Sequence, residues 1–200
     1  TTSPALNTAT GTFTFDANSN TQYRQTNNQN IPPIASPGYG NLLCQPSADG
    51  IFQYLGLAVG QTIYVQGDLI FGNGTNTCTI NTQLQDPVVS VTGNLIVNAN
   101  ATFDASSTDA STLSVGKDWT MNGTITFSSI TGGTVLFNGS IDQQINGTAA
   151  TQTFTKVVIT KTPGTILSVG GSTTIISMNN LTVNTGTFNA PSTLSLNTAG

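Results

Sequence analysis

The sequence predicts an all-β protein, and within that class a parallel β-solenoid of the right-handed β-helix type. Thr, Asn, Ser and Gly (36, 21, 17 and 21 residues) fill almost half of the 200-residue chain. Residues that favour helices at surfaces, chiefly Glu, Lys and Arg, are nearly absent, whereas Thr, Val, Ile and Phe dominate short alternating segments. A phrase of the sequence also recurs along the chain. Because 36% of the residues are apolar and regularly placed, we expect an ordered protein.

The N-terminal residues 1–50 differ in composition from the rest, and we expect them to form an arm and a Pro-rich connection with one strand. Five of the eight prolines lie there. The strand is predicted at GTFTFD, which places both aromatic side chains on one face. Its residues Thr12, Phe13, Thr14 and Phe15 are the candidate assembly strand for pairing with a neighbouring subunit. The alternative is that the arm folds back and covers the first coil of its own chain.

A β-solenoid repeat domain is predicted from residue 51 to residue 200. Its first segment, 48–59, fits either a short helix or a buried strand. Beyond Gly60 the apolar alternations are bounded by Gly, Asn, Asp or Pro, which accept turn conformations. The predicted strands are 61–66, 68–71, 77–80, 88–92, 94–98, 101–104, 112–115, 118–121, 124–127, 134–137, 142–145, 154–159, 165–169, 173–177, 180–183, 186–188 and 193–196.

An internal repeat favours the solenoid over its main alternative, an antiparallel β-sandwich. Residues 91–116 and 177–200 both contain N-L-x-V-N, then T-F-(D/N)-A, then S-T-L-S. One core position per coil is predicted at Leu69, Leu95, Trp119, Ile141, Val158 and Leu181. Their spacings of 26, 24, 22, 17 and 23 residues are typical of a coil with two or three short strands. Asn and Thr at equivalent positions are expected to hydrogen-bond from coil to coil. A sandwich also has short, regularly spaced strands.

Several phrases resemble tandem β-helix repeats of secreted and cell-surface proteins of Bacteroidetes-type bacteria. They include GNLIVNANATFDA, GGTVLFNGSIDQQINGT and GTFNAPSTLSLNTAG. The resemblance covers about residues 60–200 and brings no catalytic residues with it. It implies export, an extracellular or cell-surface location, and an adhesive or structural role.

The charge content makes several classes of function improbable. Only 6% of the residues are charged, against about a quarter in average domains, and there is no His. The four cations are too few to neutralise clustered phosphates, so no nucleic-acid partner is expected. Metal sites built on imidazole and His-dependent nucleophilic catalysis cannot be assembled. We expect no catalytic residue, no metal and no cofactor, and we interpret the nearest pair of acids, Asp104 and Asp109, as turn residues.

The two cysteines predict a disulfide. Cys44 and Cys78 are an even pair in a Thr- and Asn-rich chain, which fits one bridge in an oxidising compartment. Two buried, unpaired thiols are the alternative. Because no run of 18 apolar residues occurs, we expect no membrane insertion.

The functional expectation comes from the ends of the predicted rod. The first and last coils of a solenoid expose unpaired backbone groups, and the final STLSLNTAG has no Pro, Lys or amphipathic helix to cover them. We therefore expect an extracellular structural subunit that self-assembles head-to-tail into a filament or surface layer, through β-strand addition and coil stacking. The chief alternative is a monomeric adhesin or stalk segment that binds glycan or another surface.

Two further functions have weaker support from the sequence. Ice binding would use Thr-x-Thr pairs on one face of successive coils, and the pairs 12/14, 124/126 and 153/155 are irregularly spaced. A polysaccharide-active enzyme would need two converging carboxylates, which no segment of the sequence places together.

Overall fold

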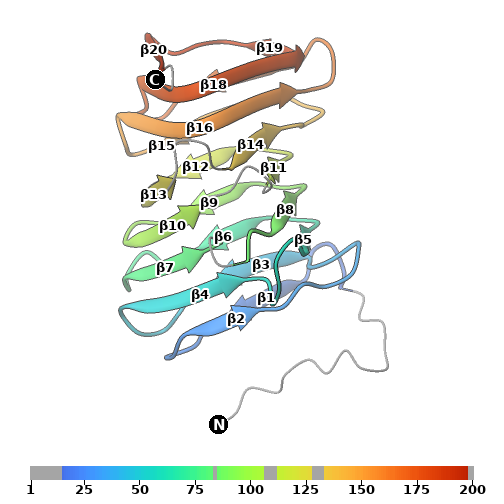
Figure 1. Cartoon of the computed structure of the whole chain (residues 1–200), viewed down its shortest axis with the longest axis vertical. Coiled ribbons are helices and arrows are strands. Elements are labelled where there is room, and N and C mark those ends of the chain that lie inside the picture. The colour runs from blue at the N-terminus through green and yellow to red at the C-terminus, as the bar shows by residue number, and fades with distance from the viewer. Residues whose placement is uncertain (1–14, 83–84, 106–111, 128–132, 198–200) are drawn as a thin grey trace.

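The computed structural model describes residues 15–82, 85–105, 112–127 and 133–197, and over these residues the chain is a parallel β-solenoid (Figure 1). No helix occurs among them. Every strand pairing within them is parallel, so the predicted solenoid is confirmed and the sandwich alternative is wrong. Segment 48–59 contains a strand, not a helix.

Three sheets run along the rod. Sheet A has eight strands, in the order β1 (Asn20–Tyr23), β3 (Asn41–Cys44), β6 (Leu69–Phe71), β9 (Leu95–Val97), β12 (Trp119–Met121), β15 (Gln143–Gly147), β17 (Ile166–Val169) and β19 (Thr187–Phe188). Sheet B has five, in the order β2 (Gln29–Ile31), β4 (Ile51–Leu55), β7 (Cys78–Asn81), β10 (Ala101–Ala105) and β13 (Thr124–Phe127). Sheet C has seven, in the order β5 (Thr62–Val65), β8 (Val88–Val91), β11 (Thr112–Val115), β14 (Thr134–Phe137), β16 (Thr151–Thr160), β18 (Ile175–Thr185) and β20 (Thr193–Leu196).

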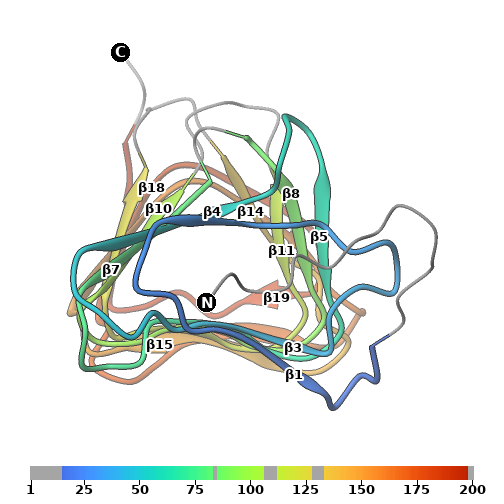
Figure 2. The same cartoon turned by 90° about the horizontal axis from the view of Figure 1, so that it is seen from below.

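Seen along the rod, the chain winds around a closed cross-section (Figure 2). Sheet A forms one side, sheet B the second and sheet C the third, and the chain visits them in that order. Near the C-terminal end the two long strands β16 and β18 replace separate B and C strands, so sheet B stops at β13.

The first coil begins before the predicted boundary at residue 50. Strands β1 and β3 join sheet A, and β2 joins sheet B. Residues 20–44 are therefore part of the stack. The Pro residues and the Asn/Gln tract of this region did not show periodicity in the sequence, although its inward positions Ile31 and Leu42 are fully buried.

A column of inward side chains on sheet A holds successive coils together. Leu69, Leu95, Trp119 and Ile145 pair in register, 26, 24 and 26 residues apart, and all four are fully buried. Each coil buries much of its apolar face against the next coil, which is a main source of stability in repeat proteins of this kind. The predicted core positions Leu69, Leu95 and Trp119 lie in this column.

The other three predicted core positions lie elsewhere. Ile141 is 55% exposed in the turn before β15, and Ile145 takes its place in the column because this turn is four residues longer than assumed. Val158 is half-buried on β16 in sheet C. The inward–outward alternation slips at Phe154 and Thr155, which are both buried, so Val157 faces inward instead. Leu181 also lies in sheet C, pairs with Val157 and is only partly buried.

Polar side chains form the expected hydrogen bonds from coil to coil, most regularly at the corner that leads into sheet A. There the side-chain oxygen of an Asn or Asp accepts a hydrogen bond from the backbone N–H of the next coil. The steps are Asn41 Oδ1 from Asp68 N (2.7 Å), Asp68 Oδ1 from Asn94 N (2.8 Å), Asn94 Oδ1 from Asp118 N (3.1 Å) and Asp118 Oδ1 from Gln144 N (2.8 Å). This Asx ladder satisfies backbone donors without any ion pair.

We predict that Asn94→Ala lowers the free energy of unfolding by about 1–3 kcal/mol, because it leaves the Asp118 N–H without its acceptor and removes the hydrogen bond that Asn94 Nδ2 donates to Asp68 Oδ1. Urea unfolding followed by circular dichroism measures the change. Asn189→Ala is the matched control, since Asn189 is exposed and outside the ladder. Equal losses in the two variants would contradict a stabilising role of the ladder.

Candidate functional site: the two ends of the solenoid

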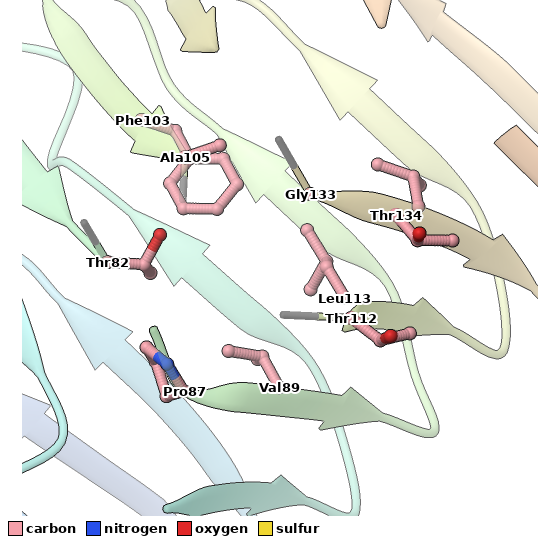
Figure 3. A pocket seen from close by; sticks show the side chains of 10 residues that line it. Thr82, Pro87, Val89, Phe103, Ala105, Thr112, Leu113, Gly133 and Thr134 are labelled. Carbon is pink, nitrogen blue, oxygen red and sulfur yellow. The ribbon is translucent and has the colours of Figure 1, made fainter. Parts of the chain in front are cut away.

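One hollow of the described chain, between sheets B and C, is too small for an organic ligand. It has a volume of about 20 Å³ (Figure 3). Its wall is mostly apolar and includes Val89, Phe103 and Leu113. Ligand pockets usually measure about 300–1,000 Å³, whereas a volume of this size holds about one water molecule.

The acidic side chains of the described residues serve turns and ladders. Asp68, Asp118 and Asp142 accept backbone N–H groups of the following coil. Asp104 accepts from Asn81 Nδ2 (2.8 Å) and Thr126 Oγ1 (3.0 Å) on the outer face of sheet B, while Asp109 lies outside the described residues. Over the described part of the chain, no three Cys or Asp side chains gather as metal ligands. The same residues include no helix of the length and hydropathy that a membrane crossing requires.

The predicted disulfide is wrong: Cys44 and Cys78 are both free and buried. Cys44 ends β3 in sheet A and pairs with Phe71, whereas Cys78 begins β7 in sheet B and pairs with Ile51. The two side chains therefore belong to different columns of the core. Burial raises the pKa of both thiols, that of Cys78 to about 11, so they pack as neutral apolar groups.

At the N-terminal end, aromatic side chains cover the first coil. Phe15 packs on Tyr39 with a ring-centroid distance of 5.5 Å, and the backbone oxygen of Phe15 accepts from Gln66 Nε2 (3.2 Å). Tyr39 is fully buried, and its hydroxyl donates to Pro32 O (2.6 Å) and lies 3.1 Å from the hydroxyl of Tyr23. Burial raises the pKa of both tyrosines.

Only the end of the predicted assembly strand can be placed. Thr12, Phe13 and Thr14 lie outside the described residues, and Phe15 touches Tyr39 of its own chain. The contact of Phe15 is thus made in cis, while pairing of residues 12–14 stays a prediction.

The C-terminal end is built differently, because its apolar inward positions are uncovered. One column of sheet C runs through Val115, Phe137, Ile159 and Val183; the first three are fully buried, and Val183 is 45% exposed. Leu196, on the last strand, is 55% exposed. No described coil lies beyond these side chains.

The backbone at this end is also incompletely paired. β20 pairs with Ile175–Met178, the first part of β18 only. From Asn180 to Val183, β18 pairs with β16 on one side, and no described strand lies on its other side. The sequence signal for this edge was the unprotected composition of residues 192–200; the length of β18 was not foreseen, since the sequence suggested two separate strands.

The Thr-x-Thr pairs do not form one common array. Thr124 and Thr126 lie on the outer face of sheet B, where Thr124 pairs with Thr102 and Thr126 with Asp104. Thr153 is exposed but Thr155 is buried, because the alternation of β16 slips between them. The pair 12/14 lies outside the described residues.

We predict that raising the pH above about 9 destabilises the fold. Tyr23, Tyr39, Cys44 and Cys78 have raised pKa values in the folded chain, so the unfolded chain loses these protons first. Their stabilising effect is complete below the ordinary pKa values of 9.0 and 10.0 and is lost as the pH rises through the folded values, about 11 for Cys78. Burial lowers the pKa of Lys161, so this side chain opposes the trend, but it is a single group.

Urea unfolding at a series of pH values from 7 to 11 measures this dependence. Tyr39→Phe removes one of the groups, and its curve should fall less steeply than that of the parent chain. A free energy of unfolding that stays constant or rises to pH 11 would contradict the prediction.

Comparison with known proteins assigns no family to this chain. No protein family, no curated protein and no solved structure matches it. The structure supports the coarser statement that the chain consists of stacked β-solenoid coils, in keeping with tandem β-helix repeats. We therefore infer the function from the geometry of the two ends.

Proposed function

We propose that the chain is an extracellular structural subunit that self-assembles head-to-tail into a filament or surface layer, by β-strand addition and stacking of coils. One observation carries the proposal: the last coils leave Val183 and Leu196 exposed beside an unpaired edge of β18. The proposal assigns the chain no catalytic activity.

Stacking a further coil on this end would bury the exposed side chains of Val183 and Leu196 and would also pair the open edge of β18. Burying a Val or Leu side chain contributes about 1.5–3 kcal/mol, and the partly buried Leu181, Phe188 and Leu194 would add to this. The edge of β18 offers its backbone groups from Asn180 to Val183 to a new parallel strand. Open strand edges are templates for pairing with another chain unless they are covered.

The opposite end also has strands that are paired on one side only, and they lie in sheets A and B. β1 and β2 are the outermost strands of sheets A and B, and each pairs with a neighbour on one side only among the described strands. Since all strands are parallel, an N-terminal end placed on a C-terminal end continues the same strand direction. Such a heterologous contact does not close on itself and generates a filament. Phe15 lies at this junction.

The extracellular location and the kinship with Bacteroidetes-type surface repeats are parts of the proposal. A composition rich in Thr, Asn and Ser, with 6% charged residues, supports both parts, because the contacts of such a chain depend little on ionic strength. The quoted repeat phrases support the kinship.

A monomeric adhesin is the second candidate, and one surface feature favours it. Phe52, 40% exposed, and Tyr54 lie on the outer face of β4, with ring planes 17° apart and centroids separated by 6.3 Å. Exposed aromatic rings with a polar tip suit contact with the apolar faces of sugars.

We predict that Val183→Asp raises the concentration needed for assembly about tenfold or more, because it places a charge in the contact and removes about 1.5 kcal/mol of apolar burial. Light scattering and negative-stain electron microscopy measure this. Val59→Asp is the matched control, since Val59 is 73% exposed in the connection from β4 to β5, away from this end. Dispersed monomers of the parent chain at high concentration, or equal assembly of the two variants, would overturn the proposal.

A glycan array on which Phe52→Ala and Tyr54→Ala abolish binding would favour the adhesin.

A further inference from the structure

The outer face of sheet B carries two rows of side chains that run along the rod, across β4, β7, β10 and β13 (Figure 1). These strands pair in register, so each row has one member on every strand. The first row is Phe52, Thr79, Thr102 and Thr124, and the second row is Tyr54, Asn81, Asp104 and Thr126. Neighbouring strands lie about 4.8 Å apart, and two residues along a strand span about 6.6 Å. The face is therefore a regular array of polar groups with an aromatic pair at one end.

The aromatic pair stands on β4. Phe52 is 40% exposed, and its ring plane lies at 17° to that of Tyr54, with 6.3 Å between the two centroids. The backbone N–H of Phe52 donates to Asn28 Oδ1 (2.9 Å), which fixes this part of the strand. An exposed aromatic face can pack against the C–H groups of a pyranose ring, and a neighbouring tyrosine adds a hydroxyl group.

The threonines of the first row offer hydroxyl groups that the fold does not use. Thr79, Thr102 and Thr124 point outward, and none of them forms a side-chain hydrogen bond with another described residue. Each hydroxyl can donate one hydrogen bond and accept two. The row therefore presents one hydrogen-bonding group per strand, at the strand spacing.

The second row is held in place by its own hydrogen bonds. Asp104 accepts from Asn81 Nδ2 (2.8 Å) and from Thr126 Oγ1 (3.0 Å), so side chains of three neighbouring strands are tied together. Groups that are fixed on strands keep their geometry better than groups on loops. Among the outward residues of these four strands Asp104 is the only charged one. A face with one carboxylate and no cation favours a neutral ligand over an anionic one.

A protein partner fits this face less well than a glycan does. An aromatic side chain buries about 150–250 Å², so Phe52 and Tyr54 together supply at most about 500 Å² of contact. A stable protein interface buries about 800 Å² on each partner, and threonine is rarely one of its energetically important residues. The remaining hydroxyl groups of the face match the many hydroxyl groups of a sugar chain.

We propose that the outer face of sheet B binds a neutral, extended glycan that lies along the rod, with one sugar unit on each of β4, β7, β10 and β13. The strand spacing is close to the advance per unit of an equatorially linked pyranose chain. Phe52 carries one ring, and the threonines of the first row bind the hydroxyl groups of the following units. This site goes beyond the proposed self-assembly, because it lies on the side of the rod and serves a filament and a monomer equally.

Isothermal titration calorimetry with cello- and manno-oligosaccharides of one to six units tests the proposal. The full chain carries Val183→Asp, so that assembly adds no avidity. We expect Kd to fall at least about tenfold from two to four units and to change little beyond four, because four strands form the site. Oligogalacturonate of four units, which is anionic, should bind at least about tenfold more weakly than its neutral counterparts.

Variants of the face locate the binding. Phe52→Ala should raise Kd for the four-unit glycan about tenfold and Thr102→Val about fivefold, because they remove a stacking ring and a hydrogen bond. Tyr64→Ala and Thr134→Val are the matched controls, since both residues point outward from sheet C, and they should leave Kd unchanged.

Three results would overturn the proposal: no binding of any neutral glycan, an affinity that does not depend on length, or equal losses in the variants and their controls. If Phe52→Ala abolishes assembly and no glycan binds, the occupant of this face is a second copy, which also overturns it. A parent chain that stays monomeric while it binds glycan contradicts only the proposed self-assembly.

Discussion

The structure depends on one constraint: each coil must place its apolar side chains on the equivalent side chains of the next coil. The column through Leu69, Leu95, Trp119 and Ile145 shows this directly, since its members pair in register and every one is fully buried. The same register stacks Asn and Asp at the corners, where the Asx ladder satisfies backbone donors. A chain stabilised in this way needs few charges, and the composition reflects that.

The constraint also decides where the molecule can act. A stack has two ends, and the chain treats them differently. The hydroxyl contact of the partly buried Tyr23 with the buried Tyr39, on which Phe15 packs, lies at the N-terminal end, whereas the C-terminal end leaves Val183 exposed at the end of a column that is otherwise buried. The hollow between sheets B and C holds about one water molecule. The exposed apolar side chains of the C-terminal end are the features on which the proposed function depends.

The sequence predicted the regular part of this architecture and missed the irregular part for physical reasons. Periodicity located the strands and the core residues Leu69, Leu95 and Trp119, because those coils differ little in length. It failed at Ile141, where a longer turn shifted the column to Ile145, and at Val158, where the slip at Phe154 and Thr155 reversed the face. The prediction of a disulfide was wrong because an even number of cysteines does not show which column of the core each side chain joins. The unpaired edges result from strand lengths, which composition does not determine.

Repetition itself explains how one copy could recognise another without charged contacts. In a stack, each strand is selected by the side chains above and below it. Where β18 extends beyond β20, its edge from Asn180 to Val183 has no described neighbour on one side. The self-association proposed above would supply that neighbour through the same register that builds the fold.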